Sequence, residues 1–194
     1  GNTGSKPWAY NNNVKTPGAA ISIDGNGVIY TVVAGASSGI LCAVNANGSE
    51  KWQYPLPGDT PYGGAVIGAD GTVFANGGKA VVAVTADGSL KWQFDLDEPV
   101  QNCVPLVDNR GYIHFITDKA TYYVLTDEGK LYGKKSLGTK SFASPVMGPD
   151  GMVYIAAQEE AKSFVFGLGT GASGYADSAW PMKGQNPQRT HLQR

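Results

Sequence analysis

Short apolar runs separated by turn residues recur along the chain at a nearly constant interval. A four-residue motif of glycine, any residue, valine or isoleucine, and a ring side chain begins at Gly27, Gly71, Gly111 and Gly151. The steps between these glycines are 44, 40 and 40 residues. No stretch has apolar residues at helical spacing over three turns. A strand repeat with a period of this size indicates a solenoid or a propeller.

Each repeat is expected to form four short strands. In the second repeat these are predicted at residues 63–67, 72–75, 80–85 and 90–95. Asp-Gly and Asn-Gly pairs between the apolar runs favour hairpins, because the turns they form need positive φ. Four-stranded antiparallel units of about 40 residues are the blades of a β-propeller. The sequence therefore predicts an all-β propeller.

The predicted blades divide the chain as one propeller domain. Blade 1 covers residues 16–57, blade 2 residues 58–97, blade 3 residues 98–140, and blade 4 with the C-terminal tail residues 141–194. Residues 1–15 align with the outer strand of a further, preceding blade. We therefore expect four full blades plus an orphan outer strand.

Small residues mark the start of the first strand in each repeat. Two adjacent aligned positions hold Ala19, Gly63, Cys103 and Ala143, and then Ala20, Gly64, Val104 and Ser144. Small side chains suit inner strands that converge on a propeller axis. The two cysteines, Cys42 and Cys103, lie in different blades, and we expect both to be buried free thiols rather than a disulfide.

A second motif recurs in phase with the first and ends in tryptophan. Tryptophans assigned to outer strands, where they would dock adjacent blades, are Trp8, Trp52, Trp92 and Trp180. Burial of such a ring contributes roughly 1.5–3 kcal/mol. The third repeat has Gly133 at this position, with Tyr132 one residue earlier, so weaker docking is expected there.

The orphan strand leaves three ways of closing the ring. The chain could be the C-terminal portion of a seven- or eight-bladed propeller, two chains could associate to complete one ring, or the four blades could close by themselves. The first residue is Gly1 rather than methionine, which suggests a mature or trimmed product.

The sequence lacks the features of a nucleic-acid-binding protein and of a protein that crosses a membrane with a helix. The 194 residues include 15 Lys and Arg against 16 Asp and Glu, so there is no basic stripe for nucleic acid. No apolar run reaches the roughly 18 residues of a transmembrane helix.

The tryptophan motif resembles a known family. Ala43-x-Asn45-x-x-Gly48-x-x-x-Trp52 and its counterpart from Ala83 to Trp92 are similar to the docking repeat of pyrroloquinoline quinone (PQQ) type β-propellers. The tail from Ser178 to Thr190 resembles the Trp-Pro-Met terminus of bacterial members. This family contains quinoprotein dehydrogenases, a lipoprotein scaffold of outer-membrane protein assembly and surface proteins of unknown role. The resemblance implies a bacterial exported protein, periplasmic or at the cell surface.

The residues do not support the family's enzymatic chemistry. Its enzymes hold the quinone with adjacent cysteines, a stacking tryptophan and a calcium ion, and this chain has no adjacent cysteines. The acidic cluster of Asp95, Asp97 and Glu98 is too small for the six to eight oxygens of calcium, so neither PQQ nor calcium is predicted. His114 is interpreted as a strand-packing residue, and His191 lies in the tail, so no catalytic or metal residue is assigned.

A binding surface is the better functional hypothesis. Loops that lead into the inner strands converge on one face, where varied residues occupy equivalent positions: Tyr62, Gln101, Asn102 and Phe142. Function in propellers lies in such loops. We therefore expect a non-enzymatic scaffold that binds a protein or a glycan. The alternative is a fragment of a quinone-dependent dehydrogenase or of a carbohydrate-active enzyme whose site needs further blades.

Overall fold

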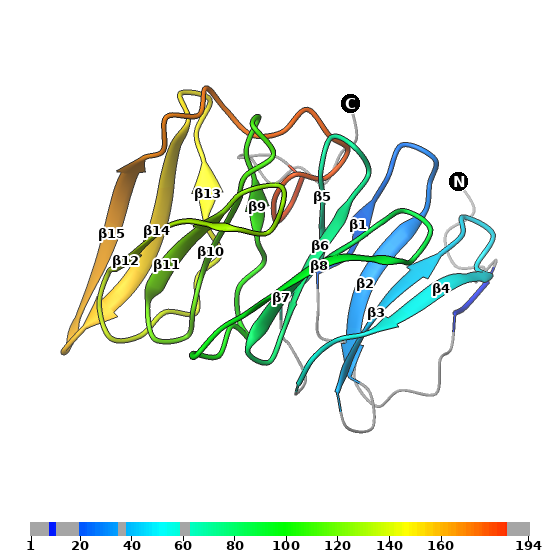
Figure 1. Ribbon diagram of the computed structural model, residues 1–194, viewed down its shortest axis with the longest axis horizontal. Helices are drawn as coiled ribbons and strands as arrows, with labels where there is room; N and C mark the ends of the chain where they lie inside the picture. Colours follow the sequence, from blue (N-terminus) through cyan, green and yellow to red (C-terminus); the bar gives the residue numbers. More distant parts are fainter. Residues whose placement is uncertain (1–7, 11–19, 35–37, 59–62, 186–194) are drawn as a thin grey trace, which may run out of the picture.

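The computed structural model describes residues 8–10, 20–34, 38–58 and 63–185, and over these ranges it contains strands and turns but no helix. The strands form four antiparallel sheets that stand side by side in a row (Figure 1). None of the described residues lies in a helix long and apolar enough to cross a membrane. The chain is therefore an all-β protein built of propeller blades, as the repeat predicted.

Three sheets have four strands in chain order, and the last has three. We call the sheets blades 1 to 4. Blade 1 has β1 (Ser22–Ile23), β2 (Ile29–Ala34), β3 (Gly39–Val44) and β4 (Glu50–Pro55). Blade 2 has β5 (Val66–Ile67), β6 (Val73–Gly77), β7 (Ala80–Val84) and β8 (Leu90–Asp95). Blade 3 has β9 (Leu106–Val107), β10 (Ile113–Ile116), β11 (Thr121–Leu125) and β12 (Leu131–Ser136), and blade 4 has β13 (Val146–Met147), β14 (Met152–Glu159) and β15 (Lys162–Gly169).

The inner strands approach one another closely. Ala20 and Gly64 form a parallel bridge between blades 1 and 2, and the Val104 amide donates to Ser144 Oγ at 3.0 Å between blades 3 and 4. A Cβ added to Gly63 would lie 2.5 Å from the Cys103 carbonyl oxygen. The small residues in this part of the repeat are thus required by the spacing of neighbouring backbones.

Tryptophans of the outer segments lie against glycines of the next blade. A Cβ added to any of these glycines would fall within 2.8 Å of an indole ring atom. The pairs are Trp8 with Gly48, Trp52 with Gly88, and Trp92 with Gly129. Each glycine has a positive φ, between +78° and +94°. Glycine therefore serves twice here, because it forms the hairpin turn and leaves room for the ring.

Two of these tryptophans also form a hydrogen bond across the junction. Trp52 Nε1 donates to the Ala86 carbonyl at 3.0 Å, and Trp92 Nε1 donates to the Asp127 carbonyl at 2.8 Å. The strand register places both rings identically, opposite Ala43 in blade 1 and opposite Ala83 in blade 2. The indole is thus held by packing and by its one polar group.

The corresponding position in blade 3 is a glycine and therefore has no side chain. Gly133 pairs with Val124 in the register that a tryptophan occupies in blades 1 and 2, and nothing lies within 4 Å of its missing Cβ. The neighbouring Tyr132 is 59% exposed. No tryptophan therefore links blade 3 to blade 4.

Blade 4 differs from the prediction in its outer part. Within the described residues β15 pairs only with β14, so the blade lacks a fourth strand. Trp180, expected on that strand, lies instead in the segment that returns from β15 across the inner strands of blades 3 and 2 (Figure 1).

The returning segment closes the free edges of two inner strands. The Ile67 amide donates to the Trp180 carbonyl and the Val107 amide to the Pro181 carbonyl, each at 2.8 Å. Trp180 and Met182 are buried, at 4% and 0% exposure. These apolar side chains gain more burial near the axis than at an outer edge, which explains why the tail does not form the expected strand.

Three glycine variants test the docking contact. Gly129→Ala is expected to lower the free energy of unfolding by about 2–4 kcal/mol, because its Cβ meets the Trp92 ring and its φ is positive. Gly71→Ala has a similar φ of +81° but its nearest atom is 3.9 Å away, so it should lose only about 1–2 kcal/mol. Gly133→Ala, in open space, should change stability by less than about 0.5 kcal/mol. Urea unfolding measures all three, and equal losses for Gly129→Ala and Gly71→Ala would show that the tryptophan contact contributes nothing.

Candidate binding surface

The loops that lead into the inner strands gather along one side of the row of blades. Backbone hydrogen bonds join neighbouring loops. The Val100 amide donates to the Gly78 carbonyl at 2.9 Å, and the Ser141 amide donates to the Asp118 carbonyl at 3.0 Å. We call this side the loop face. It is formed by residues 57–58, 77–79, 96–102, 117–120 and 137–143. Three of the four residues predicted for binding lie on it, whereas Tyr62 is outside the described residues.

Gln101 and Asn102 are held in place by one carboxylate. Their backbone amides lie 3.3 and 3.4 Å from Asp118 Oδ1, and Asn102 Nδ2 donates to the same oxygen at 3.3 Å. Nearby, Thr117 Oγ1 donates to Glu98 Oε2 at 2.6 Å. These contacts fix the loop on the neighbouring hairpin of blade 3, so Gln101 and Asn102 are presented in a defined position.

Phe142 is a largely exposed aromatic side chain on the loop face. It is 62% exposed, and the Lys140 ammonium lies 4.7 Å from its ring centroid. The intervening Ser141 is anchored, because its hydroxyl donates to the Ala156 carbonyl at 2.8 Å. A rigid base thus presents an aromatic ring and a cation together, which favours contact with another molecule.

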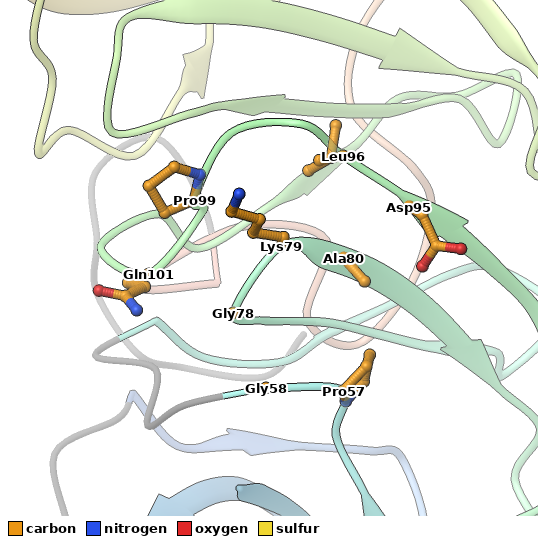
Figure 2. Close-up of a pocket in the computed structure, with 9 residues that line it drawn as sticks. All are labelled: Pro57, Gly58, Gly78, Lys79, Ala80, Asp95, Leu96, Pro99 and Gln101. Atoms are coloured by element: carbon orange, nitrogen blue, oxygen red, sulfur yellow. The ribbon is translucent and has the colours of Figure 1, made fainter.

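The loop face contains two separate hollows. One of about 460 Å³ lies between the loops of blades 1, 2 and 3, and Figure 2 shows it ringed by residues from three segments. Its lining includes Gly58, Lys79, Asp95 and Gln101. A second hollow of about 310 Å³ is lined by Lys140, Phe142 and the edge of blade 4. The structure therefore does not bring Gln101 and Phe142 into one pocket.

A buried polar cluster in blade 3 was missed by the sequence interpretation of His114. His114 Nε2 lies 3.1 Å from Asp108 Oδ2, and His114 Nδ1 lies 2.6 Å from the Tyr122 hydroxyl. Arg110 donates to the same carboxylate through Nη2 at 2.6 Å and Nε at 3.0 Å. Asp108 and His114 are both fully buried. His114 is thus a buried strand residue, as interpreted from the sequence, and it is also part of a hydrogen-bonded network.

A sequence signal for this cluster exists in the repeat itself. In blades 1 and 3 an aspartate stands three residues before the repeat glycine, and it contacts the ring residue three after it. Tyr30 Oη donates to Asp24 Oδ2 at 3.1 Å in blade 1, as His114 contacts Asp108 in blade 3. In blade 2 the aspartate is replaced by Gly68, whose added Cβ would lie 3.0 Å from the Phe74 ring. Pairing these two positions would have predicted a polar contact for His114.

The cluster is built to keep one carboxylate ionised. Burial of Asp108 disfavours its charge, but hydrogen bonds from His114, Arg110 and the Tyr112 amide outweigh that effect and lower its pKa to about 2. Burial, with the negative charge of Asp108, raises the pKa of Tyr122. The network therefore stabilises blade 3 and offers no reactive group to solvent.

The remaining described residues supply no other obvious chemistry. They contain no group of three or more His, Cys, Asp or Glu side chains arranged to hold a metal ion. Both cysteines are buried and free, and burial raises the pKa of the Cys103 thiol to about 12. Asp95, from the acidic loop, accepts a hydrogen bond from Gln93 at 2.6 Å. The loop face presents an exposed aromatic ring and an exposed cation, Phe142 and Lys140.

Comparison with known proteins agrees with this architecture. Residues 1–84 match the family model described as outer membrane protein assembly factor BamB. The fold is similar to that of BamB from Moraxella catarrhalis, with a TM-score of 0.64 and 19% identity over 88% of this chain and 51% of that one. It is also similar to virginiamycin B lyase from Staphylococcus aureus, with a TM-score of 0.62 and 21% identity over 86% of this chain and 60% of that one. A europium-containing methanol dehydrogenase matches with a TM-score of 0.53 and 15% identity over 74% of this chain and 27% of that one.

The chain therefore has a β-propeller fold, and its residues 1–84 are similar to PQQ-like repeats. It spans about half of the length of the BamB chain and 60% of the lyase chain that it matches. No curated protein matches it closely enough to add an activity.

The Asp108 cluster predicts a specific loss of stability in acid. Because its folded pKa is lower than its unfolded value of 3.8, Asp108 stabilises the fold fully above about pH 4, and the contribution of about 2 kcal/mol disappears as the pH falls toward 2. Asp108→Asn should therefore be less stable than wild type at pH 7, and the difference should shrink between pH 4 and 2.

Urea unfolding across this pH range measures the effect. The buried neighbour Val107 supplies a control, because Val107→Ala removes only apolar atoms and its stability deficit should not change with pH. A constant deficit for Asp108→Asn from pH 7 to 2 would contradict the assigned role.

Proposed function

We propose that this chain is a non-enzymatic propeller scaffold that binds another protein through the loop face. The observation that carries the proposal is the exposed Phe142 ring with the Lys140 ammonium above it, on a loop fixed by Ser141. Exposed aromatic rings and cations held in place by a rigid support are typical of protein interfaces. The hollow beside them is open to solvent, which suits a broad contact rather than an enclosed small molecule.

A protein partner also fits the comparisons. The model that matches residues 1–84 describes an assembly factor of outer membrane proteins, and BamB is among the similar structures. On this basis we propose that the protein is exported to the bacterial envelope, in the periplasm or at the cell surface. A glycan ligand is the competing outcome on the same face, because an exposed aromatic ring can also stack on a sugar.

An enzyme fragment is the second candidate, favoured by the likeness to a lyase and to a methanol dehydrogenase. The chain covers 60% of the lyase and 27% of the dehydrogenase. An active site in such a protein would need groups from blades beyond these four. Addition of PQQ and calcium tests the quinone-dependent form of this candidate.

Phe142→Ala is expected to weaken partner binding by tenfold or more, the loss of about 1.4 kcal/mol or more that removal of an interface aromatic causes. The probe is a random peptide library displayed on phage and selected on the immobilised chain, followed by affinity measurement for each recovered peptide. Tyr132→Ala is the matched control, because Tyr132 is equally exposed at 59% but lies on the outer strand of blade 3.

The same pair of variants separates the competing outcomes. Peptides that bind wild type and Phe142→Ala equally would exclude the loop face as their site. Selection of no peptide, together with glycan-array binding that Phe142→Ala abolishes, would replace the protein partner by a glycan.

Thermal unfolding with PQQ and calcium tests the enzyme candidate. We expect the Tm to stay within about 1 °C of its value without ligand, because a ligand that does not bind the folded state cannot stabilise it. A saturable rise in Tm that needs both PQQ and calcium would contradict the scaffold proposal and favour a quinone-dependent fragment.

A further inference from the structure

Blade 4 presents a face that is covered in every other blade. The ring residue of the repeat motif is buried in blades 1 to 3, with 1% exposure for Tyr30, 3% for Phe74 and 0% for His114. The equivalent Tyr154 is 43% exposed. On the adjacent strand Val165, which pairs with Ala156 on the same face, is 76% exposed. This apolar face resembles the surface that other blades bury against a neighbour, but no neighbouring blade covers it among the described residues.

The same blade also has an unpaired edge in the part of the chain that the structure describes. In blades 1 to 3 the third strand pairs with a fourth, whereas β15 pairs with β14 alone. Blade 4 could therefore accept one more strand along β15. An exposed edge of this length is a template for strand addition.

The missing strand has a counterpart at the other end of the row. Trp8 lies against Gly48 in the way that Trp52 lies against Gly88. Tyr10 extends this arrangement, because its hydroxyl donates to Glu50 Oε2 at 2.7 Å and accepts from Gln53 Nε2 at 2.8 Å. Residues 8–10 thus stand in front of blade 1, where the outer strand of a preceding blade would lie, although they form no strand themselves.

The exposed face of blade 1 supplies a second complement to blade 4. In blade 2 the residues that face the preceding blade, Val73 and Ala75, are fully buried. Their equivalents in blade 1, Ile29 and Thr31, are only partly buried. One molecule therefore carries both halves of a blade junction, at opposite ends.

We propose that a second copy of this chain fills the junction, with residues 8–10 of one copy added to β15 of the other as the fourth strand of blade 4. The register follows from the repeat. Gly167 pairs with Tyr154 as Ala83 pairs with Phe74, and Ala83 in turn lies opposite Trp92. Trp8 of one copy would therefore lie opposite Gly167 of the other.

Head-to-tail contact at both ends closes a ring of two copies. Two copies together would be about as long as the BamB chain, because one copy covers 51% of that chain. The contact buries Tyr154 and Val165, and it joins blade edges that would otherwise stay exposed. Phe142 lies at the border between this face and the loop face, whereas Gln101 lies away from it.

Sedimentation velocity on the 194-residue chain tests the proposal. We expect a dimer at about 100 µM, and Val165→Glu should weaken it at least tenfold by placing a charge in the apolar junction. Leu90→Glu is the matched control, because Leu90 is an exposed apolar residue of β8, far from both junction halves, and this variant should remain dimeric. A monomer at all concentrations, or a dimer unaffected by Val165→Glu, would overturn the proposal.

Cysteine cross-linking tests the register independently of the charged variant. The expected pairing places Ala9 of one copy opposite Phe166 of the other, within reach of a disulfide. Ala9→Cys and Phe166→Cys proteins are prepared separately and mixed under mild oxidation. A linked heterodimer that neither protein forms alone supports the head-to-tail junction. Linkage only within one chain, in a protein that carries both substitutions, would show that the chain closes on itself and would overturn the second-copy assignment.

Discussion

The contact of an indole ring with a glycine in the next blade is the constraint on which the row of blades depends. The same hairpin supplies both parts of the site, because Gly88 leaves space for Trp52 and the Ala86 carbonyl accepts the indole hydrogen bond. A side chain at the glycine would remove both the turn geometry and the ring contact. This double demand explains why glycine and tryptophan recur together at the same spacing, as Gly48 with Trp52 and Gly88 with Trp92.

The junction between blades 3 and 4 shows what replaces this contact when the tryptophan is absent. Arg110 donates to the Thr170 carbonyl of blade 4 at 3.0 Å, and its guanidinium lies 4.5 Å from the Tyr112 ring centroid. The nearby Asn109 amide donates to the Gly174 carbonyl at 3.0 Å. The junction is thus partly polar and depends on Arg110. Because Asp108 holds Arg110 in place, the buried cluster of blade 3 also supports its contact with blade 4.

The sequence was sufficient for the frame because its periodic signals are local. Turn glycines, small inner residues and outer tryptophans each act within a repeat or between neighbouring repeats, so alignment of the repeats was enough to place them. Trp180 could not be placed in this way, because its burial depends on contacts with Ile67, more than one hundred residues earlier. The polar partner of His114 was not predicted for a different reason, since Asp108 lies in a turn whose other copies often have glycine.

The side chains of the loop face are under a different physical constraint from the side chains that pack the blades together. Its backbone is fixed by contacts such as those of Asp118 with Asn102, but the outward side chains contribute little to blade packing. They can therefore vary between repeats without loss of stability, which is why alignment identified the positions and not the ligand. Phe142 illustrates the point, because Ser141 and Lys140 hold its surroundings in place while its ring remains largely in solvent. A rigid support prevents this apolar ring from folding back onto the protein, so its burial lowers the free energy only when another molecule covers it. The fixed conformation of the loops therefore favours recognition.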